Sequence, residues 1–194
     1  MVGHCDAARR VLSQGARFVI DIIIVTFNST SHLTDCLHSI ADLSAVVVID
    51  NASTDDSADV AERAGCRVIR NTTNIGFARA VNQGIAATDA DMVLLLNPDA
   101  ALTPDTLAHL CAAMTDPSIA AVGGRLLGDG GVEQQPWWPF PSAADAWRTA
   151  LFLPTKTWKP SGAPVAADVD FVVGASMLIR RNVLEELGGF DERF

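Results

Sequence analysis

Three apolar runs of strand length, each ending abruptly at polar residues, limit what this chain can fold into. They span residues 19–27, 45–49 and 92–96, and the last is a continuous MVLLL that stops at Asn97-Pro98-Asp99. Runs as apolar as these are typical of strands covered on both faces. Helical patterns separate them, and strands that alternate with helices favour a parallel sheet with right-handed crossovers. The sequence therefore predicts an α/β fold, a Rossmann-like, mostly parallel sheet with helices on both faces.

Start and stop signals locate the helices between these runs. The signals are Ser or Thr at the N-cap and Gly or Pro beyond the last turn. Thr103, with Pro104 next, is a predicted N-cap, and Gly65 is a predicted C-cap. Helices are expected to begin near residues 30, 57, 77, 103 and 182, and shorter strands are expected at residues 66–70, 119–123 and 169–173.

Composition and charge argue against several classes of protein. The 194 residues are 49% hydrophobic and 19% charged, which allows one sizeable core. A net charge of −9 and the lack of a Lys/Arg run argue against nucleic acid as the partner. No apolar run is long enough to span a bilayer and no signal-peptide pattern opens the chain, so we expect a cytoplasmic protein.

Motifs of other common sites are missing. The sequence contains no G-x-S-x-G, no G-x-x-x-x-G-K-[ST] and no G-x-G-x-x-G, which weakens the serine-hydrolase, P-loop and dinucleotide-binding readings. The histidines form no H-x-x-x-H pair, and no C-x-x-C pair occurs. We therefore expect reduced, buried thiols and no His/Cys metal site; the four cysteines are Cys5, Cys36, Cys66 and Cys111.

The composition divides the chain into three parts. Residues 1–18 are an N-terminal arm, either loose or forming a short strand or helix outside the core, and residues 19–124 are the α/β core. Residues 125–194 differ, because residues 134–164 hold all four tryptophans and most of the prolines. A loop this long is usually functional or mobile, although the tryptophans could instead cover a small second core.

Polar residues follow each of the three apolar runs. Thr26 and Asn28 follow the first, a group between Asp50 and Asp55 follows the second, and the Asn-Pro-Asp turn follows the third. Parallel strands share a C-terminal edge, and ligands of open α/β sheets bind there. The helix predicted to start near residue 77 adds free N–H groups that attract phosphate. Taken alone, the Asn-Pro-Asp turn reads as a cap of the next helix, but three clusters in series predict a binding site.

Five segments resemble the inverting family 2 glycosyltransferases, which have the GT-A fold. The resemblance is greatest to the bacterial rhamnosyltransferases of cell-wall and O-antigen synthesis. It covers nearly everything from residue 21 to 124 and again from 168 to the end. The segments are VTFNS (25–29), VVIDNASTDDS (47–57), NIGFARAVNQG (74–84), DMVLLLNPDA (91–100) and GASMLIRRNVLEELGGFDERF (174–194).

The resemblance implies a site for a nucleotide sugar and a divalent metal ion. Asn97-Pro98-Asp99 stands where the family has its Asp-x-Asp metal motif, so Asp99 is the expected ligand of Mg²⁺ or Mn²⁺. Asp50 is expected at the base or ribose, with Ser53 and Asp55 supporting its loop. The implied nucleotide-binding residues are Thr26, Asn28, Asp50, Ser53, Asp55, Asn74, Gly76, Phe77, Asn82, Asp91 and Asn97.

The family's reaction also implies the partners. An acceptor hydroxyl attacks the sugar from the face opposite the nucleotide, helped by a carboxylate base that the family carries beyond the segment resembled by residues 188–194. We therefore expect the chain to be truncated before its base, to have an incomplete acceptor-side region at 125–194, and to be weak or inactive. The expected donor is a dTDP- or UDP-sugar, with rhamnose as the candidate sugar. The expected acceptor is a glycan or polyprenyl-linked glycan at the inner membrane face, reached through peripheral contact.

Three other functional interpretations of the same residues remain open. A receiver-type signalling domain would use Asp50 as phosphoacceptor, but it needs an acidic pair where this chain has Thr26-Phe27-Asn28. An oxidoreductase could place Asp50 on a ribose, yet the glycine fingerprint is missing. A non-catalytic nucleotide-binding protein of glycosyltransferase descent is the third alternative, because the metal motif is altered.

Overall fold

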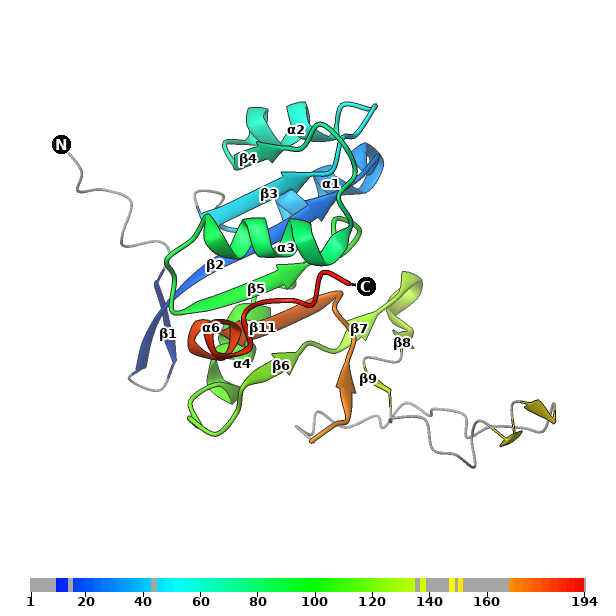
Figure 1. The fold of residues 1–194 in the computed structure, drawn as a ribbon. Coiled ribbons are helices and arrows are strands. Elements are labelled where there is room, and N and C mark those ends of the chain that lie inside the picture. The colour runs from blue at the N-terminus through cyan, green and yellow to red at the C-terminus, as the bar shows by residue number, and fades with distance from the viewer. Residues whose placement is uncertain are drawn as a thin grey trace.

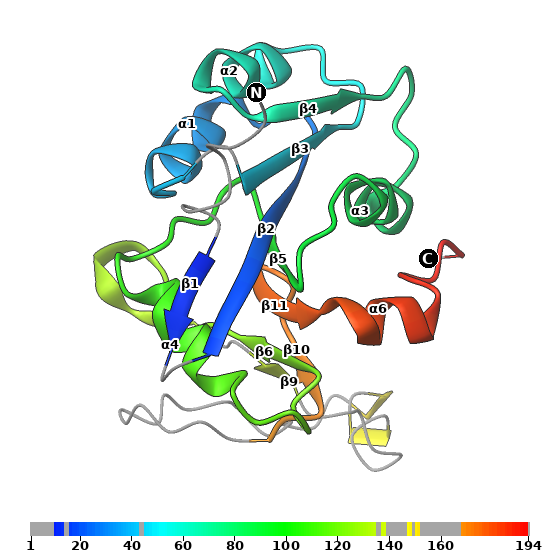
Figure 2. The ribbon, with the colours of Figure 1, turned by 90° about the vertical axis from the view of Figure 1, so that its left-hand side faces the viewer.

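In the computed structural model of the chain, the described residues are 10–13, 16–42, 45–134, 137–138, 147–148, 150–151 and 168–193. They form one large sheet with helices on both of its faces (Figures 1 and 2). The predicted α/β fold with a mostly parallel sheet is confirmed.

The central strands are the apolar runs of the sequence. β2 covers Ala16–Thr26, β3 Val46–Asp50, β4 Arg67–Arg70 and β5 Met92–Leu96. They lie in the order β4-β3-β2-β5, and every neighbouring pair is parallel. Every residue of β3 and β5 is buried, as expected for strands covered on both faces.

Beyond β5 the arrangement differs from the prediction. β6 covers Ala121–Gly123, and the alternating pattern predicts it as a further strand of the parallel series. Instead β11, which covers Ser176–Arg180, lies between β5 and β6 and is antiparallel to both. Periodicity identifies a strand but not its neighbours, so the sequence pattern could not assign this place to a segment about 80 residues further along.

Helices cover both faces of the sheet, as Figure 2 shows. α1 (Thr30–His38), α2 (Ser57–Ala64) and α4 (Thr106–Ala113) lie on one face, and α3 (Phe77–Ala86) and α6 (Arg181–Leu187) lie on the other. Alternate strand residues enter two separate cores. Ile22 and Ile24 of β2 pack under α1 and α4, whereas Ile23 packs under α3.

Two helix ends match the sequence signals and one start does not. Gly65 and Gly188 both adopt the left-handed conformation that ends a helix (φ of 93° and 74°), which side chains with a Cβ rarely adopt. α4 begins at Thr106, three residues after the predicted N-cap. Asp105 takes the N-cap position, and Thr103 contacts the first helical turn through its N–H, which donates to the Thr106 hydroxyl (3.0 Å).

Adjacent arginines on β11 and α6 bind the ends of helices on opposite faces. The Arg180 guanidinium donates to the carbonyl of Met114, just past α4 (2.5 Å). The Arg181 guanidinium donates to the carbonyls of Ala90 (2.6 Å) and Ile85 (3.5 Å), at the end of α3. The carbonyl end of a helix carries partial negative charge, so each cation joins the inserted strand to one helical layer.

The remaining described elements are short. β1 (Arg10–Ser13) pairs with the start of β2, so this part of the N-terminal arm forms a strand. β7 (Leu126–Leu127) pairs with β8 (Glu133–Gln134) around the 3-10 turn η2 (Asp129–Gly131), and β9 (Trp137–Trp138) pairs with β10 (Phe171–Val172). Cys5 and most of the Trp/Pro-rich segment lie outside the described residues. Among the described helices, none has both the length and the apolar character needed to cross a membrane.

Candidate functional site

The parallel strands bring polar residues to one edge of the sheet. Thr26 at the end of β2 lies opposite Asp50 at the end of β3. The ladder continues one residue past the strands, because the N–H of Asn51 donates to the Thr26 carbonyl (2.9 Å) and that of Asn71 donates to the Asp50 carbonyl (2.8 Å). The ends of β2, β3 and β4 are therefore held at fixed spacing, and their loops leave from one edge.

Two buried polar atoms at this edge lack a partner. Thr26 is 0% exposed and Asp50 is 3% exposed. Asp50 accepts from the N–H of Ser53 through one carboxylate oxygen (3.2 Å), while its other oxygen and the Thr26 hydroxyl have no hydrogen-bond partner among the described groups. A buried polar atom left unpaired costs about 1–3 kcal/mol. This edge is therefore suited to a polar ligand that supplies the missing partners.

Asn28 and Asp55 hold the two loops above Asp50 together. Asn28 has a positive φ of 53°, and its side-chain oxygen accepts from the N–H of Thr54 (2.8 Å). Both carboxylate oxygens of Asp55 accept from backbone N–H groups, one from Thr30 (3.1 Å) and the other from Ser57 (3.0 Å). The hydrogen bond from the Ser57 hydroxyl is the largest of the effects that lower the pKa of Asp55 to about 2. These two predicted site residues have protein groups as their partners and fix the shape of the loops.

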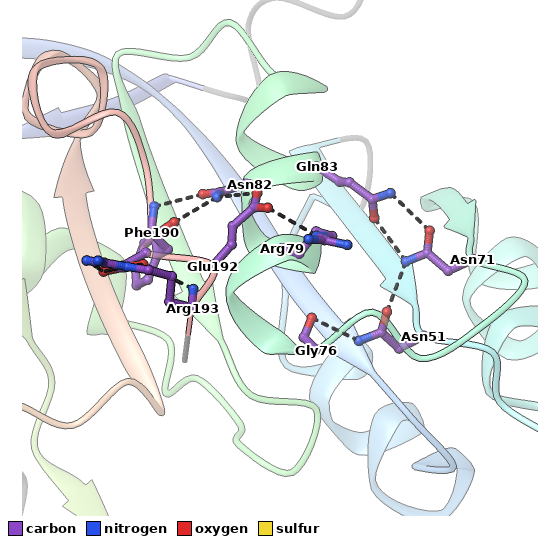
Figure 3. Close-up of polar contacts among 10 residues, drawn as sticks. Asn51, Asn71, Gly76, Arg79, Asn82, Gln83, Phe190, Glu192 and Arg193 are labelled. Carbon is purple, nitrogen blue, oxygen red and sulfur yellow. Dashed lines mark hydrogen bonds and ion pairs between the residues drawn. The ribbon is translucent and has the colours of Figure 1, made fainter.

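A network of side-chain amides connects these loops to α3, as Figure 3 shows. Asn71 and Gln83 exchange two hydrogen bonds (2.9 and 3.0 Å), and Asn71 also donates to the Asn51 side chain (2.9 Å). Asn51, only 3% exposed, donates in turn to the carbonyl of Gly76 (3.3 Å) at the start of α3. Sequence reasoning missed all three amide residues. Their signal was the position of Asn51 and Asn71, each directly after a strand.

The start of α3 combines an open backbone with exposed aromatic rings. Gly76 has a φ of 86°, and the side chain of Asn74 accepts from its N–H (3.0 Å). No atom lies within 4 Å of the place where a Gly76 side chain would begin. Phe77 beside it and Phe27 after β2 are each 49% exposed. The helix terminus is thus accessible, and it carries the partial positive charge that attracts phosphate.

The Asn97-Pro98-Asp99 turn rests on α1. The carbonyl of Asn97 accepts from the buried thiol of Cys36 (3.6 Å), while its N–H donates to the Ala175 carbonyl (3.0 Å). Burial, and secondarily the charge of Asp99, raises the pKa of Cys36 to about 12, so this thiol stays protonated. The turn is anchored to α1 and to the residue before β11, and it leaves Asp99 exposed.

The donor set at this turn fits a metal ion shared with a phosphate ligand. No group of three or more His, Cys, Asp or Glu side chains suited to a metal occurs among the described residues. Mg²⁺ and related ions usually take one or two carboxylates and complete their shell with water and substrate phosphates. An exposed Asp99 with the Asn97 amide nearby matches that kind of site and not an all-protein cage.

Asp91 lies at the wrong end of the sheet for the predicted pocket. It precedes β5, and its carboxylate accepts from the N–H of Val19 (2.9 Å) near the start of β2. The strand β5 lies between it and Asn97, and the six residue steps from 91 to 97 span about 20 Å at about 3.3 Å per residue. The motif that carries the resemblance spans both ends of one strand, so nearness in sequence was mistaken for nearness in space.

Asn82 also contacts something other than the predicted nucleotide wall. Its side-chain amide donates to the carbonyl of Phe190 (2.9 Å) and accepts from the N–H of the same residue (2.8 Å). Residue 82 lies on α3 more than one turn from Gly76, which turns its side chain toward the C-terminal segment (Figure 3). The structure therefore does not bring Asn82 together with the residues at the sheet edge.

Ser176 joins the edge from the antiparallel strand. It begins β11 opposite Leu96, is 6% exposed, and its hydroxyl is a third buried group without a partner among the described residues. No role is predicted for it from the sequence, because its strand follows the long Trp/Pro-rich segment. Its place beside the end of β5 extends this edge, with its buried polar groups, from the β2–β3 side toward β6.

Shallow hollows of about 490 and 320 Å³ lie at the opposite edge of the sheet. Their side chains already have protein partners: Arg67 donates to the Ala87 carbonyl (2.5 Å), and the Asp91 carboxylate accepts from Val19. We assign no ligand to them.

The sheet order and the loops at its C-terminal edge define an α/β domain of the GT-A glycosyltransferase type. Solved structures of that type share its fold, with TM-scores up to 0.61. The chain belongs to the family described as Glycosyl transferase family 2, whose model matches residues 21–188.

The similar proteins are all longer than this chain. An N-acetylglucosaminyl-diphospho-decaprenol L-rhamnosyltransferase of Mycobacterium tuberculosis is 29% identical over 91% of the chain and 66% of its own length. The mannosyltransferase PcManGT from Pyrobaculum calidifontis, solved with GDP-Man and Mn²⁺, has 21% identity and a TM-score of 0.61 over 91% of the chain and 48% of its own. TarS 1–349 of S. aureus, solved with UDP, has 18% identity and a TM-score of 0.60 over 90% and 50%. The chain thus spans about half to two thirds of these relatives.

Proposed function

We propose that this chain binds a nucleoside diphosphate sugar at the C-terminal edge of its sheet and serves inverting transfer of that sugar to a glycan or polyprenyl-linked acceptor. The buried Thr26 hydroxyl and one buried carboxylate oxygen of Asp50, which have no partner in the described part of the chain, carry the proposal, because such atoms are costly without a polar ligand. They lie at the edge where ligands of open α/β sheets bind.

The chemistry of Asp50 favours a base with an N–H at its pairing edge. A carboxylate accepts hydrogen bonds and donates none, so the oxygen of Asp50 that has no partner among the described residues calls for a donor from the ligand. Uracil and thymine offer an imide N–H, whereas cytosine and adenine present a lone pair at the corresponding ring nitrogen. Phe27, half exposed after the same edge, offers a ring on which the base can stack. These features support a UDP- or dTDP-sugar over a CDP- or ADP-sugar as donor; guanine also carries a ring N–H, so GDP belongs among the nucleotides that test the choice.

The diphosphate is assigned to the space between α3 and the Asn97-Pro98-Asp99 turn. The N–H groups at the start of α3 and the close approach allowed at Gly76 suit phosphate oxygens. Asp99, with Asn97 beside it, would hold Mg²⁺ or Mn²⁺ there. When bound, the ion stabilises the negative charge that develops on the leaving diphosphate.

The acids near the end of the chain are poor candidates for the general base. Arg193 holds the pKa of Asp191 below its usual range, and hydrogen bonds from Asn82 and then Arg79 do the same for Glu192. A carboxylate with a lowered pKa is a weaker proton acceptor. We therefore assign neither as the group that activates the acceptor hydroxyl.

The sugar and acceptor are proposed from the mycobacterial relative. L-Rhamnose from dTDP-rhamnose and a polyprenyl-diphosphate-linked glycan at the cytoplasmic membrane face are the first candidates. Exposed apolar side chains on the acceptor-side region support peripheral contact with such an acceptor; they are Leu127, Trp147, Leu151 and Phe171.

Calorimetric titration with UDP and dTDP, each with and without Mn²⁺, tests the proposal. We expect binding that Mn²⁺ strengthens about tenfold, and an Asp99→Ala variant that keeps the metal-free affinity but loses the gain from Mn²⁺. CDP and ADP are the matched controls for the base. Failure of the wild-type chain to bind either UDP or dTDP would rule the proposal out.

A further inference from the structure

Residues 188–193 return along α3 after α6 ends. Figure 1 shows that β11 and α6 carry the chain away from the C-terminal edge of the sheet, and that the last described residues come back toward it beside α3. Gly188 ends α6, and its neighbour Gly189 also has a positive φ (85°). A side chain at Gly189 would meet the Asn82 side-chain oxygen at 2.6 Å, so the segment lies directly on this helix.

Asn82 holds the backbone of this segment at two points. Its amide oxygen accepts from the N–H of Phe190 (2.8 Å) and its amide nitrogen donates to the carbonyl of the same residue (2.9 Å). Few side chains other than Asn and Gln can accept and donate through one planar group in this way. The same nitrogen also donates to a carboxylate oxygen of Glu192 (3.0 Å), and the other oxygen of Glu192 pairs with Arg79 (3.1 Å; Figure 3).

The two anchors differ in strength. The side chains of Arg79 and Glu192 are 56% and 42% exposed, and an ion pair in water contributes little. The contacts between Asn82 and the Phe190 backbone are partly buried and satisfy groups that would otherwise lose water without gaining a partner. Most of the docking therefore depends on one amide.

We propose that Asn82 is a positioning residue that fixes residues 188–193 on α3 and so directs the chain leaving α6 toward the nucleotide edge. Arg79 and Glu192 add a second, weaker anchor nearer to Gly76. The importance of that edge rests on the proposed function; the docking itself does not. Asn82 thus acts on the relative placement of the C-terminal segment and the donor site, and it does not touch the nucleotide.

Exchange of the Phe190 amide hydrogen, followed by NMR in the 194-residue chain, measures the docking directly. We expect Asn82→Leu, which keeps the volume and removes both contacts, to speed this exchange about tenfold or more. UDP affinity in the presence of Mn²⁺ should change by no more than about twofold. Asn182→Leu, at an exposed asparagine of α6, is the matched control and should change neither quantity.

A pair of substitutions that exchanges donor and acceptor separates positioning from general loss of structure. Asn82→Asp keeps an acceptor for the Phe190 N–H but loses the donor to the Phe190 carbonyl and places a carboxylate against Glu192, so we expect faster exchange than in wild type. Glu192→Gln alone keeps an acceptor for Asn82 and should have a small effect. In the double variant the amide of residue 192 donates to the carboxylate of residue 82, with no change in net charge, and protection should return in part.

The outcomes distinguish this inference from the proposed function. Unchanged Phe190 exchange in Asn82→Leu, or a double variant as unprotected as Asn82→Asp, would overturn the positioning role. A tenfold loss of UDP affinity with normal Phe190 protection would instead make Asn82 a nucleotide contact. If the wild-type chain bound no nucleotide, the proposed function would fail while the exchange data still judged the docking.

Discussion

The two edges of the sheet use polar groups in opposite ways. At the edge where β2 and β5 begin, Asp91 accepts from a backbone N–H, and Arg181 donates to carbonyls at the end of α3. At the other edge, the hydroxyls of Thr26 and Ser176 and one carboxylate oxygen of Asp50 are buried without a partner among the described residues. Polar groups at the first edge are paired and stabilise the fold. Those at the second edge lower its stability, and we propose that a ligand supplies their partners. Substitutions at the two edges should therefore separate stability from nucleotide binding.

The largest effect is expected at the satisfied edge. Arg181→Met keeps much of the side chain's length but removes the donor to the Ala90 carbonyl, together with the contacts to the Ile85 carbonyl and the Thr88 hydroxyl. We expect a loss of about 3 kcal/mol in the free energy of unfolding, measured by urea denaturation, with UDP affinity unchanged. A loss of affinity at full stability would mean that the two edges do not divide their roles as we describe.

At the unsatisfied edge, Asp50→Asn should act on binding. The amide oxygen of the variant can still accept from the imide N–H of the base. In the other orientation of the amide, its NH₂ group faces that N–H, and two donors meet. We expect UDP affinity to fall by about 10- to 100-fold, corresponding to roughly 1.4–2.7 kcal/mol of binding free energy. The free energy of unfolding should stay the same or rise slightly. If Asp50→Asn lowered the free energy of unfolding and bound UDP normally, this assignment would be wrong.

Thr26→Val separates stability from nucleotide binding at a single hydroxyl, because the two side chains are similar in shape. Removing a buried hydroxyl that has no partner should stabilise the fold by about 1 kcal/mol and weaken UDP binding by a few-fold. Denaturation measures the expected gain in stability, and calorimetry on the same sample measures the expected loss of UDP affinity. Destabilisation would show that the hydroxyl has a partner in solution.

The smallest effect concerns Asp55, whose two oxygens bind the loops and not a ligand. Its pKa lies at about 2 in the fold against 3.8 in an unfolded chain, so the ionised form stabilises the fold fully above pH 4. That contribution is lost as the pH falls from about 4 to 2. Asp55→Asn should therefore lower the melting temperature modestly at pH 7, and the difference from wild type should shrink as the pH falls from about 4 and vanish only below about pH 2. A constant difference across this range would exclude the carboxylate as its cause.

The sequence predicts the parallel core well because each of its strands is a self-contained signal. The MVLLL run of β5 begins and ends where the structure places it, and α2 ends at its predicted glycine. The place of β11 is a long-range property, since its neighbour β5 is about 80 residues away in sequence and no local pattern encodes that pairing.

The site was predictable only where residue type and strand end coincided. Thr26 and Asp50 end their strands and reach the edge, whereas Asp91 lies in the same motif as Asn97 but at the strand's other end. Asn82 shows a second limit, because a residue on a helix can face either the ligand or another segment. Its partner Phe190 comes more than one hundred residues later and carries no signal of this contact.

The pairing of β11 with β6 also decides which part of the molecule can be exchanged. The N–H of Gly124 donates to the carbonyl of Ser176 (3.1 Å), so the chain leaves the sheet and re-enters it at neighbouring points. The intervening segment is in effect an insertion with tied ends, and doubling the length of such a loop costs only about 0.6 kcal/mol. Evolution or an engineer can therefore replace residues 125–175 with a segment of different length and sequence without rebuilding the parallel part of the sheet.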